Sequence, residues 1–279
     1  MKIATYNVNG VNRRLANILD WFARAEPDIA CLQELKATDR QFPRSAFEAA
    51  GYDAVWRGQS AWNGVAILSR IGEPVLTRTE LPGDTEDGQA RYIEAAVAGI
   101  LVASFYAPNG NPQPGPKFDY KIAWNERLIE HARSLFAAGV PVVLAGDYNI
   151  VPEPRDIYAT RSYDDNALVQ PQSRAAFARL REQGWVDALR QCHPDETLYT
   201  FWDYKRNRWQ RDAGLRLDHL LLSAATAPRL IGAGVDRDER GRDGASDHAP
   251  VWIELKDEPS CRLERAGGGQ ATRPRAKQS

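Results

Sequence analysis

The stretch VVLAGDYNI, residues 142–150, begins as a buried β-strand and ends in polar residues. Its apolar opening is typical of a strand that is buried on both faces of a sheet. The strand then passes through a glycine into Asp147 and Asn149, so an acid and an amide follow directly on the core. Side chains at strand ends can converge on one rim of a sheet, where ligand pockets form. These two residues are therefore candidates for a functional site.

Five other segments carry polar residues at or near the end of an apolar strand: YNVNG, QELK, FYAPNG, GLRLDHLLLS and SDHAPVWIEL. Independent surface positions would not all fall at strand ends, so the segments together predict a single site. The candidate residues are Asn7, Asn9, Glu34, Lys36, Tyr106, Asn109, Asp147, Asn149, Asp218, Asp247 and His248.

Each motif taken alone has a simpler structural explanation. Asn7 and Asn9 could be turn residues before a glycine, because asparagine tolerates left-handed backbone. Glu34 could be a surface residue just past a strand, and Asp147 could begin a loop. Asp218 is harder to explain in this way, because it has apolar neighbours on both sides and a buried carboxylate needs a partner.

The residue types restrict the chemistry of the predicted site. The acids Glu34, Asp147 and Asp247 and the amides Asn7 and Asn149 offer hard oxygen ligands, which suit Mg²⁺ or Mn²⁺ rather than zinc. A single histidine in the set also speaks against catalytic zinc. Mg²⁺ held by one or two carboxylates is the usual arrangement for work on phosphates, so the set points to hydrolysis of a phosphate ester.

Asp218 and His248 add acid–base chemistry to this set. A histidine that is oriented by a buried aspartate is a general base or a charge-stabilising pair. The sequence contains no GxxxxGK[ST] loop and no GxSxG motif. Nucleotide-triphosphate motor chemistry and serine-hydrolase chemistry are therefore not expected.

Composition indicates an ordinary globular protein. The 279 residues carry a formal net charge of −1, so the chain as a whole does not attract nucleic acid electrostatically. Nucleic-acid binding would need a local basic patch. The three cysteines lie far apart and form no CxxC pair, which fits a reducing compartment. The N-terminus has no apolar signal region, and no apolar run approaches the length of a membrane span. We expect a cytoplasmic protein, monomeric and without a membrane partner.

Periodicity predicts one domain over residues 1–255 and a disordered basic tail over 256–279. Asp119 is expected to cap a helix that ends before Gly139, and Ser173 to cap a shorter helix that ends at Gly184. Two sheets packed face to face with helices outside would bury most of the apolar faces. A further helix is expected over 14–25, and strands are expected over 2–8, 28–33, 52–57, 64–69, 92–98, 100–106, 142–147, 216–222 and 250–255.

The six motifs, in this order and at these intervals, resemble the exonuclease III family of abasic-site endonucleases. That family belongs to the endonuclease/exonuclease/phosphatase superfamily, and the resemblance runs from Met1 to about Leu255. It implies a four-layered α/β sandwich, in which two mixed β-sheets pack face to face with helices outside. This agrees with the two-sheet prediction made from the pattern alone.

The resemblance also implies a role for each motif residue. It implies Glu34 as the main metal carboxylate, Asp147 as proton donor or acceptor, and Asp218 as the acid that orients His248. Whether Asp147 or the His248–Asp218 pair activates water stays open, with Asp147 preferred as base. Asn9 stands where some relatives have aspartate. The implied catalytic residues are Tyr106, Asp147, Asn149, Asp218 and His248, and the implied metal-site residues are Asn7, Glu34, Asp147, Asn149, Asp247 and His248.

The stretch YTFWDYKRNRWQRDAGLR, residues 199–216, interleaves aromatic and cationic residues. A nucleic-acid-binding loop uses aromatic residues to stack on bases and cationic residues to contact phosphates. A core strand followed by a solvated charged loop would show a similar sequence. Phe201, Leu215 and Leu217 align with the wall of a pocket for a flipped-out abasic sugar. In that family tryptophan often stands in place of Leu215, so this departure implies a looser pocket and a shifted balance between abasic incision and 3′ exonuclease action. The predicted DNA-contacting residues are Lys36, Arg91, Asn109, Phe201, Trp202, Arg206, Leu215 and Leu217.

The sequence therefore predicts a Mg²⁺-dependent DNA-repair phosphodiesterase, for which Mn²⁺ can substitute. Its expected partner is duplex DNA with abasic sites or 3′ ends, cut 5′ to the lesion to leave a 3′-hydroxyl. One alternative is a phosphodiesterase of the same fold that acts on RNA or a small phosphodiester. A second alternative is a catalytically inactive DNA-binding relative.

Overall fold

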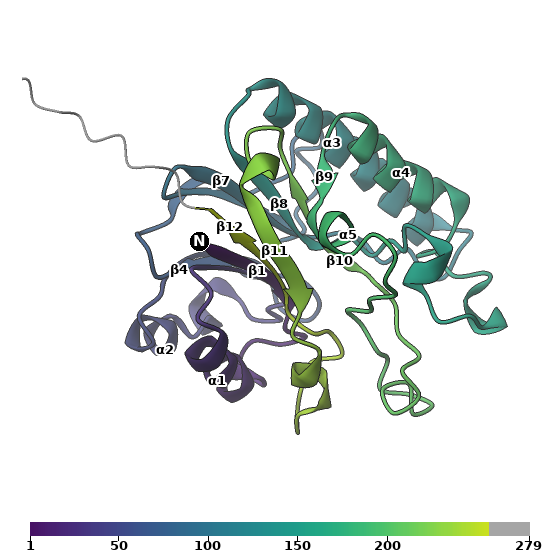
Figure 1. The fold of residues 1–279 in the computed structure, drawn as a ribbon, viewed down its shortest axis with the longest axis horizontal. Coiled ribbons are helices and arrows are strands. Elements are labelled where there is room, and N and C mark those ends of the chain that lie inside the picture. The colour runs from purple at the N-terminus through teal and green to yellow at the C-terminus, as the bar shows by residue number, and fades with distance from the viewer. Residues whose placement is uncertain (257–279) are drawn as a thin grey trace, which may run out of the picture.

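The structure is a computed structural model that describes residues 1–256, and it contains two six-stranded sheets (Figure 1). The predicted tail after Lys256 lies outside the described residues. The first sheet has the order β11 (Leu230–Val235), β12 (Val251–Leu255), β1 (Lys2–Asn7), β2 (Ile29–Gln33), β4 (Val65–Ser69) and β3 (Asp53–Arg57). The second has the order β5 (Val75–Arg78), β6 (Tyr92–Val97), β7 (Ile100–Tyr106), β8 (Val142–Asp147), β10 (Asp218–Leu222) and β9 (Val186–Asp187).

Both sheets are mixed, as predicted. The pairs β1–β2 and β7–β8 are parallel, and the other neighbours are antiparallel. The expected hairpin-like pairs are confirmed as β3–β4 and β6–β7. Between the sheets lies an apolar core that includes Ile3, Ile67, Val102, Val143 and Leu220.

Helices cover the outer face of each sheet (Figure 1). Helices α1 (Leu15–Ala25) and α2 (Arg44–Ala49) pack on the first sheet, with Trp21 and Phe47 in a core against Tyr6. Helices α3 (Pro116–Ala137) and α4 (Pro171–Glu182) pack on the second, with Trp124 and Phe177 among the buried residues. The short α5 (Ala188–Cys192) contributes to the core between the sheets. The predicted four-layered sandwich is confirmed. None of the helices within residues 1–256 has the length and apolar character needed to cross a bilayer.

The structure corrects two helix caps. Helix α3 follows Gly115 and starts with a proline, so Asp119 lies in its first turn instead of capping it. Ser173 lies inside α4, where its hydroxyl donates to the carbonyl of Ala167 at 2.7 Å. Proline fits the first position of a helix because no partner for its missing N–H is needed there. In both helices this proline, and not a side-chain cap, marks the start.

Several short elements were not predicted. They are α2, α5, β5, β9 and β11. All residues of β5 are exposed, and β11 contains two glycines, so neither shows the apolar alternation that marks a strand.

Strand register brings the polar strand ends together. In β8, Val143, Ala145 and Asp147 alternate onto the face that meets the other sheet, whereas Leu144 packs under the helices. Asp147 lies opposite Tyr106 of β7 and Asp218 of β10. Each therefore ends an inward-facing row at the same edge of the second sheet.

A buried ionic network anchors the chain that leads into β10. Arg216 is 1% exposed, and its guanidinium contacts Asp156 and Asp187 at 2.8 Å each. Arg190 joins the same network through Asp156 at 2.6 Å. Burial opposes ionisation of Asp187, but Arg216 outweighs burial and holds the pKa of that carboxyl below its ordinary value.

Asp187→Asn is expected to lower the free energy of unfolding by about 3 kcal/mol at neutral pH, because it leaves Arg216 with one buried anion fewer. The depressed pKa means that the stabilisation is present above the unfolded pKa of about 4 and is lost as the pH falls through the folded value. Urea unfolding of both proteins at pH 7 and pH 3 checks this. Asp195→Asn is the control, since that side chain is 98% exposed. An equal loss at both pH values would contradict the electrostatic account.

Candidate active site

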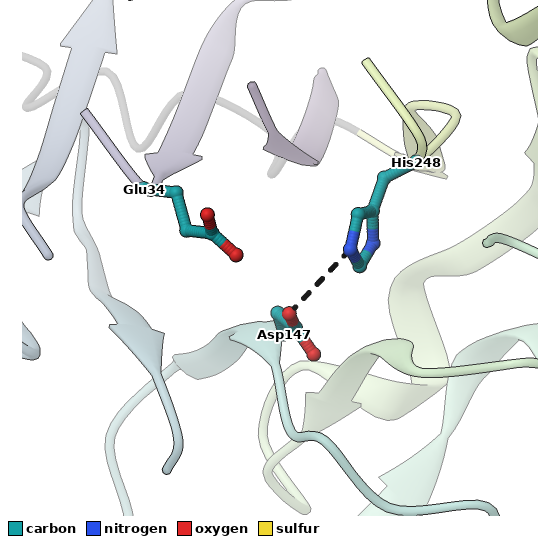
Figure 2. Close-up of side chains that lie close together, drawn as sticks. All are labelled: Glu34, Asp147 and His248. Atoms are coloured by element: carbon teal, nitrogen blue, oxygen red, sulfur yellow. Dashed lines mark ion pairs between the residues drawn. The ribbon is translucent and has the colours of Figure 1, made fainter. Parts of the chain in front are cut away.

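Three titratable side chains from different segments meet at the open edge between the sheets (Figure 2). Glu34 directly follows β2, Asp147 ends β8, and His248 precedes β12. Each offers a ligand atom, and these atoms lie within 4.8 Å of one another. The first sheet thus supplies two of the groups and the second sheet the third, as the strand-end pattern predicts.

Asn7, at the end of β1, connects the acids of the two sheets. Its side-chain amide donates to Glu34 Oε1 at 2.9 Å and to Asp147 Oδ2 at 3.0 Å. Its oxygen accepts the backbone N–H of Asn9 at 3.0 Å. Asn7 was expected to be a metal or water-bridged ligand, but as placed it turns its nitrogen toward the carboxylates. Asn7 therefore positions Glu34 and Asp147 and keeps two buried acids apart.

His248 is held by Asp218, as the resemblance implies. The imidazole Nδ1 lies 2.8 Å from Asp218 Oδ2, and Nε2 points to Asp147 Oδ2 at 3.7 Å. Thr200 donates its hydroxyl to the same Asp218 oxygen at 2.6 Å. The ring of Phe201 meets the imidazole edge-on at 4.9 Å between centroids. The histidine is thus fixed on one side and presents its second nitrogen to the site.

The surroundings shift the pKa values of Glu34 and Asp147 in opposite directions. Burial raises the pKa of Asp147 above its ordinary value, a rise that His248 opposes and Asp218 increases. Burial also acts on Glu34, but Lys36 and the Asn7 amide outweigh it and lower the pKa of that carboxyl. Burial disfavours the imidazolium of His248, yet Asp218 outweighs it and raises the pKa of the ring. Glu34 is therefore the permanent anion, and Asp147 is the acid with the greater affinity for a proton.

Four residues at or next to the site have a strained backbone. Asn9, Glu34, Lys36 and Asn149 all have left-handed backbone, with φ between 46° and 52°. Such a conformation costs a non-glycine residue about 1–3 kcal/mol and persists where the surroundings enforce it. The Asn149 carbonyl accepts from the buried ammonium of Lys121 at 2.6 Å, which holds this turn in place.

The donor set fits a hard divalent cation. Glu34 and Asp147 offer carboxylate oxygens on facing sides, which is the type of ligand that Mg²⁺ or Mn²⁺ prefers. His248 commits Nδ1 to Asp218 and contributes at most Nε2. Asp247 lies outside this cluster and accepts from the Asn9 amide at 2.8 Å. The amide of Asn149 donates to the Ala107 carbonyl at 2.9 Å and accepts from Asn109 at 3.0 Å.

Tyr106 and Arg91 form another wall of the site. Burial, together with Glu34 and Asp147, raises the pKa of the Tyr106 hydroxyl, so the phenol keeps its proton. The guanidinium of Arg91 lies 4.9 Å from the centre of the Tyr106 ring. The Lys36 ammonium lies 5.3 Å from the ring of Trp62, which is 70% exposed, and the loop that carries Trp62 packs beside the Arg91 segment, since Gly64 donates to the Ala90 carbonyl at 2.9 Å. Cations and aromatic rings thus border the carboxylates.

The structure does not bring all predicted DNA contacts to the surface. Trp202 and Leu215 are 0% exposed and Leu217 is 2% exposed, so none of them can touch a ligand without rearrangement. Trp202 instead supports its loop, with its indole N–H donating to Asp212 at 3.0 Å. Arg206 is exposed and Phe201 is half-buried, which suits contact with a ligand. The alternation of aromatic and charged residues in the sequence does not show which side chains of this loop point into the core and which point to solvent.

Two residues near the site were missed by sequence reasoning. Thr200 fixes Asp218 through its hydroxyl. Lys121 is fully buried beneath the site and donates to the carbonyls of Pro108 and Asn149. Lys121 lies on the inner face of α3, where a lysine among apolar residues is an available but weak signal. Lys121 therefore supports the backbone beneath the site through these two hydrogen bonds.

Comparison with known proteins gives a consistent result. Residues 4–248 match the Endonuclease/Exonuclease/phosphatase family. The chain is 32% identical to exodeoxyribonuclease III of Haemophilus influenzae, covering 92% of this chain and 100% of that protein. A 3′ phosphatase from Neisseria, solved with a product DNA hairpin, is 39% identical with a TM-score of 0.88, covering 92% of this chain and 99% of the other. An AP endonuclease from Archaeoglobus fulgidus is 34% identical with a TM-score of 0.87, covering 92% and 100%.

Asp218→Asn is expected to lower the pKa of His248, because it removes the charge that outweighs burial of the ring. The imidazolium is then lost at lower pH, so the alkaline limb of kcat/KM should move by roughly one to three pH units toward acid. Initial rates on a phosphodiester substrate across pH 5 to 10 check this. Thr200→Val, which keeps the Asp218 charge but removes the hydroxyl that donates to this carboxylate and accepts from the backbone N–H groups of Leu217 and Asp218, should move the limb less. An alkaline limb that stays in place would show that the protonation of His248 does not govern turnover.

Proposed function

The chain belongs to the endonuclease/exonuclease/phosphatase family and is a phosphodiester-hydrolysing nuclease, and from this premise we propose that it is a divalent-metal-dependent DNA-repair enzyme. It cuts duplex DNA 5′ to an abasic site to leave a 3′-hydroxyl. It also removes nucleotides and blocking groups from 3′ ends. The observation that carries the proposal is the meeting of Glu34, Asp147 and His248, with Asp218 behind the histidine.

The two acids suit different roles in this reaction. Glu34, whose pKa is lowered, remains ionised and would hold Mg²⁺ or Mn²⁺ together with Asp147. When bound, the ion neutralises charge on the phosphate. Asp147, whose pKa is raised, is the better proton acceptor for the attacking water. The imidazolium of His248 donates from Nε2 to a phosphate oxygen, and the Asn149 turn holds Asp147 through a backbone N–H at 2.9 Å.

The surroundings support a nucleic-acid substrate. Exposed Trp62 beside Lys36, and Arg91 beside Tyr106, place stacking surfaces and phosphate partners next to the carboxylates. A small phosphodiester would use little of this border. The DNA hairpin bound by the Neisseria relative agrees with this choice of substrate.

Action at 3′ ends is favoured by one further feature. Leu215 and Leu217 form a buried cluster with Val151 and Leu168, so the expected wall of a sugar pocket is closed. A flipped-out abasic sugar would have to open this cluster or rest against the half-buried residues packed on it, such as Phe201. A terminal nucleotide has more freedom to enter a shallow site. We therefore expect 3′-end processing to be strong relative to abasic incision.

The test uses a labelled duplex with a central tetrahydrofuran abasic analogue, beside an intact duplex, in Mg²⁺ or EDTA. A metal-dependent band ending 5′ to the analogue is expected, together with a ladder that shortens both duplexes from the 3′ end. A ladder without the band would support the exonuclease activity and contradict the endonuclease activity. No cleavage of either duplex would reject the DNA substrate and favour RNA or a small phosphodiester.

Asp147→Asn is expected to lower kcat by roughly 10²–10⁴-fold, because the amide cannot accept a proton. Affinity for uncut duplex should change little, since Asn7 and Asn149 still hold the side chain. Single-turnover rates and fluorescence anisotropy measure the two quantities. If the wild type and the variant both cleave only at the background rate, the chain is an inactive DNA-binding relative.

A further inference from the structure

Arg91, in the wall of the active site, is held between two tyrosine rings. Its guanidinium carbon lies 4.9 Å from the centre of the Tyr106 ring and 5.9 Å from the centre of the Tyr120 ring, which comes from α3. Its Nε donates to the side-chain oxygen of Gln89 at 2.8 Å, and a terminal nitrogen donates to the backbone carbonyl of Tyr106 at 3.2 Å. These partners are neutral, and no carboxylate within residues 1–256 forms an ion pair with Arg91. The guanidinium is therefore fixed in place but keeps its positive charge.

Asp87 holds two of the side chains that orient Arg91. The Tyr120 hydroxyl donates to the two carboxylate oxygens of Asp87, at 3.0 Å and 3.1 Å. Burial raises the pKa of the Tyr120 hydroxyl to about 12, so the phenol keeps the proton that it donates. The same carboxylate accepts the backbone N–H of Gln89 at 3.2 Å, which fixes the turn that carries this glutamine. The Asp87 side chain is only 6% exposed, so it is held inside the loop and does not point into solvent.

A different arginine takes up the negative charge of Asp87. The Arg127 guanidinium, on α3, contacts the Asp87 carboxylate at 3.0 Å. It also donates to the carbonyls of Leu81 and Pro82 at 3.2 Å each, and so ties the loop between β5 and β6 to the helix. An aspartate paired directly with Arg91 would hold it as well, but would neutralise the charge that a phosphate contact uses. The indirect link through Asp87 orients Arg91 and leaves that charge available.

We propose that Asp87 is a positioning residue for the nuclease reaction: it acts through Tyr120 and Gln89 to hold the Arg91 guanidinium toward the substrate without neutralising it. Arginine has a long side chain with many rotamers, and ordering it before the substrate arrives reduces the entropy that binding must otherwise lose. The inference rests on the proposed function, because Arg91 has a ligand only if a nucleic-acid strand lies beside Tyr106. It follows that the loss of Asp87 should affect turnover only while Arg91 is present.

The test is a double-mutant cycle between Asp87 and Arg91, read as kcat/KM on a labelled duplex that is shortened from its 3′ end. Arg91→Gln is expected to lower kcat/KM roughly 10- to 100-fold, because a hydrogen-bonded charge contact is lost. Asp87→Ala should lower it roughly tenfold alone, but less than about twofold when Arg91→Gln is already present. Asp84→Ala is the matched control, since Asp84 lies in the same loop and pairs with Arg127 at 3.4 Å but contacts neither of the side chains that orient Arg91.

A second readout separates positioning from damage to the fold. Binding to uncut duplex is measured by anisotropy in EDTA over a series of salt concentrations. Arg91→Gln should reduce the slope of log K against log salt by about one, and Asp87→Ala should reduce it by no more than this. Tyr120→Phe keeps the ring but cannot donate to Asp87, so it should show a smaller loss of the same kind. Asp87→Asn keeps an acceptor for the Tyr120 hydroxyl and should recover most of the activity.

The outcomes separate this inference from the proposed function. Equal losses for Asp87→Ala with and without Arg91 would overturn the inference and leave the proposed function intact, because Asp87 would then only support the fold. A wild type that neither binds nor cuts duplex DNA would reject the proposed function, and the inference with it. If thermal melting shows that Asp87→Ala does not fold, Tyr120→Phe takes its place in the same cycle with Arg91→Gln and decides the result.

Discussion

The active site depends on the two-residue alternation of strands in two sheets packed face to face. Asn7, Tyr106, Asp147 and Asp218 each end a row of side chains that points into the space between the sheets. Deeper in these rows the side chains are apolar, and at the open edge they become polar. A slip of one residue in β8 would turn Asp147 toward the helices and remove it from the site. Gly146 protects this register, because a Cβ there would lie 2.1 Å from the Phe105 carbonyl oxygen of the neighbouring strand.

The same constraint explains why the two acids behave differently. Packing of the sheets buries both acids and brings Asp147 against Asp218, and burial and a nearby like charge both raise the cost of ionising a carboxyl group. Asn7 reduces this cost for each acid, but only Glu34 has an ammonium beside it. Asp147 faces Asp218 and deeper burial, so its pKa rises. Two carboxylates of one site therefore differ in role: Glu34 stays ionised, and Asp147 is the proton acceptor.

Much of this arrangement could be predicted from the sequence. The pattern of strands and helices predicts two packed sheets, and the strand-end motifs predict that Glu34, Asp147 and His248 share one site. The sequence could not show which way Asn7 turns its amide, because that depends on acids that are 27 and 140 positions away. Nor could it show that Trp202 supports its loop from inside, since the indole finds its partner Asp212 only after the loop closes. The left-handed backbone at Glu34 and Lys36 is likewise enforced by tertiary contacts and contradicts local preference.

Cations of the chain itself partly compensate the acids of the site. The carboxylates of Glu34, Asp147, Asp218 and Asp247 face the cationic groups of Lys36 and His248. Asn9 matters here because an aspartate in its place would add a further charge beside Asp247. Instead, its amide donates to Asp247, and its oxygen accepts from Lys36 at 2.6 Å. The Lys36 ammonium thus contacts both Glu34 and Asn9, and the chain itself supplies positive charge on this side of Glu34.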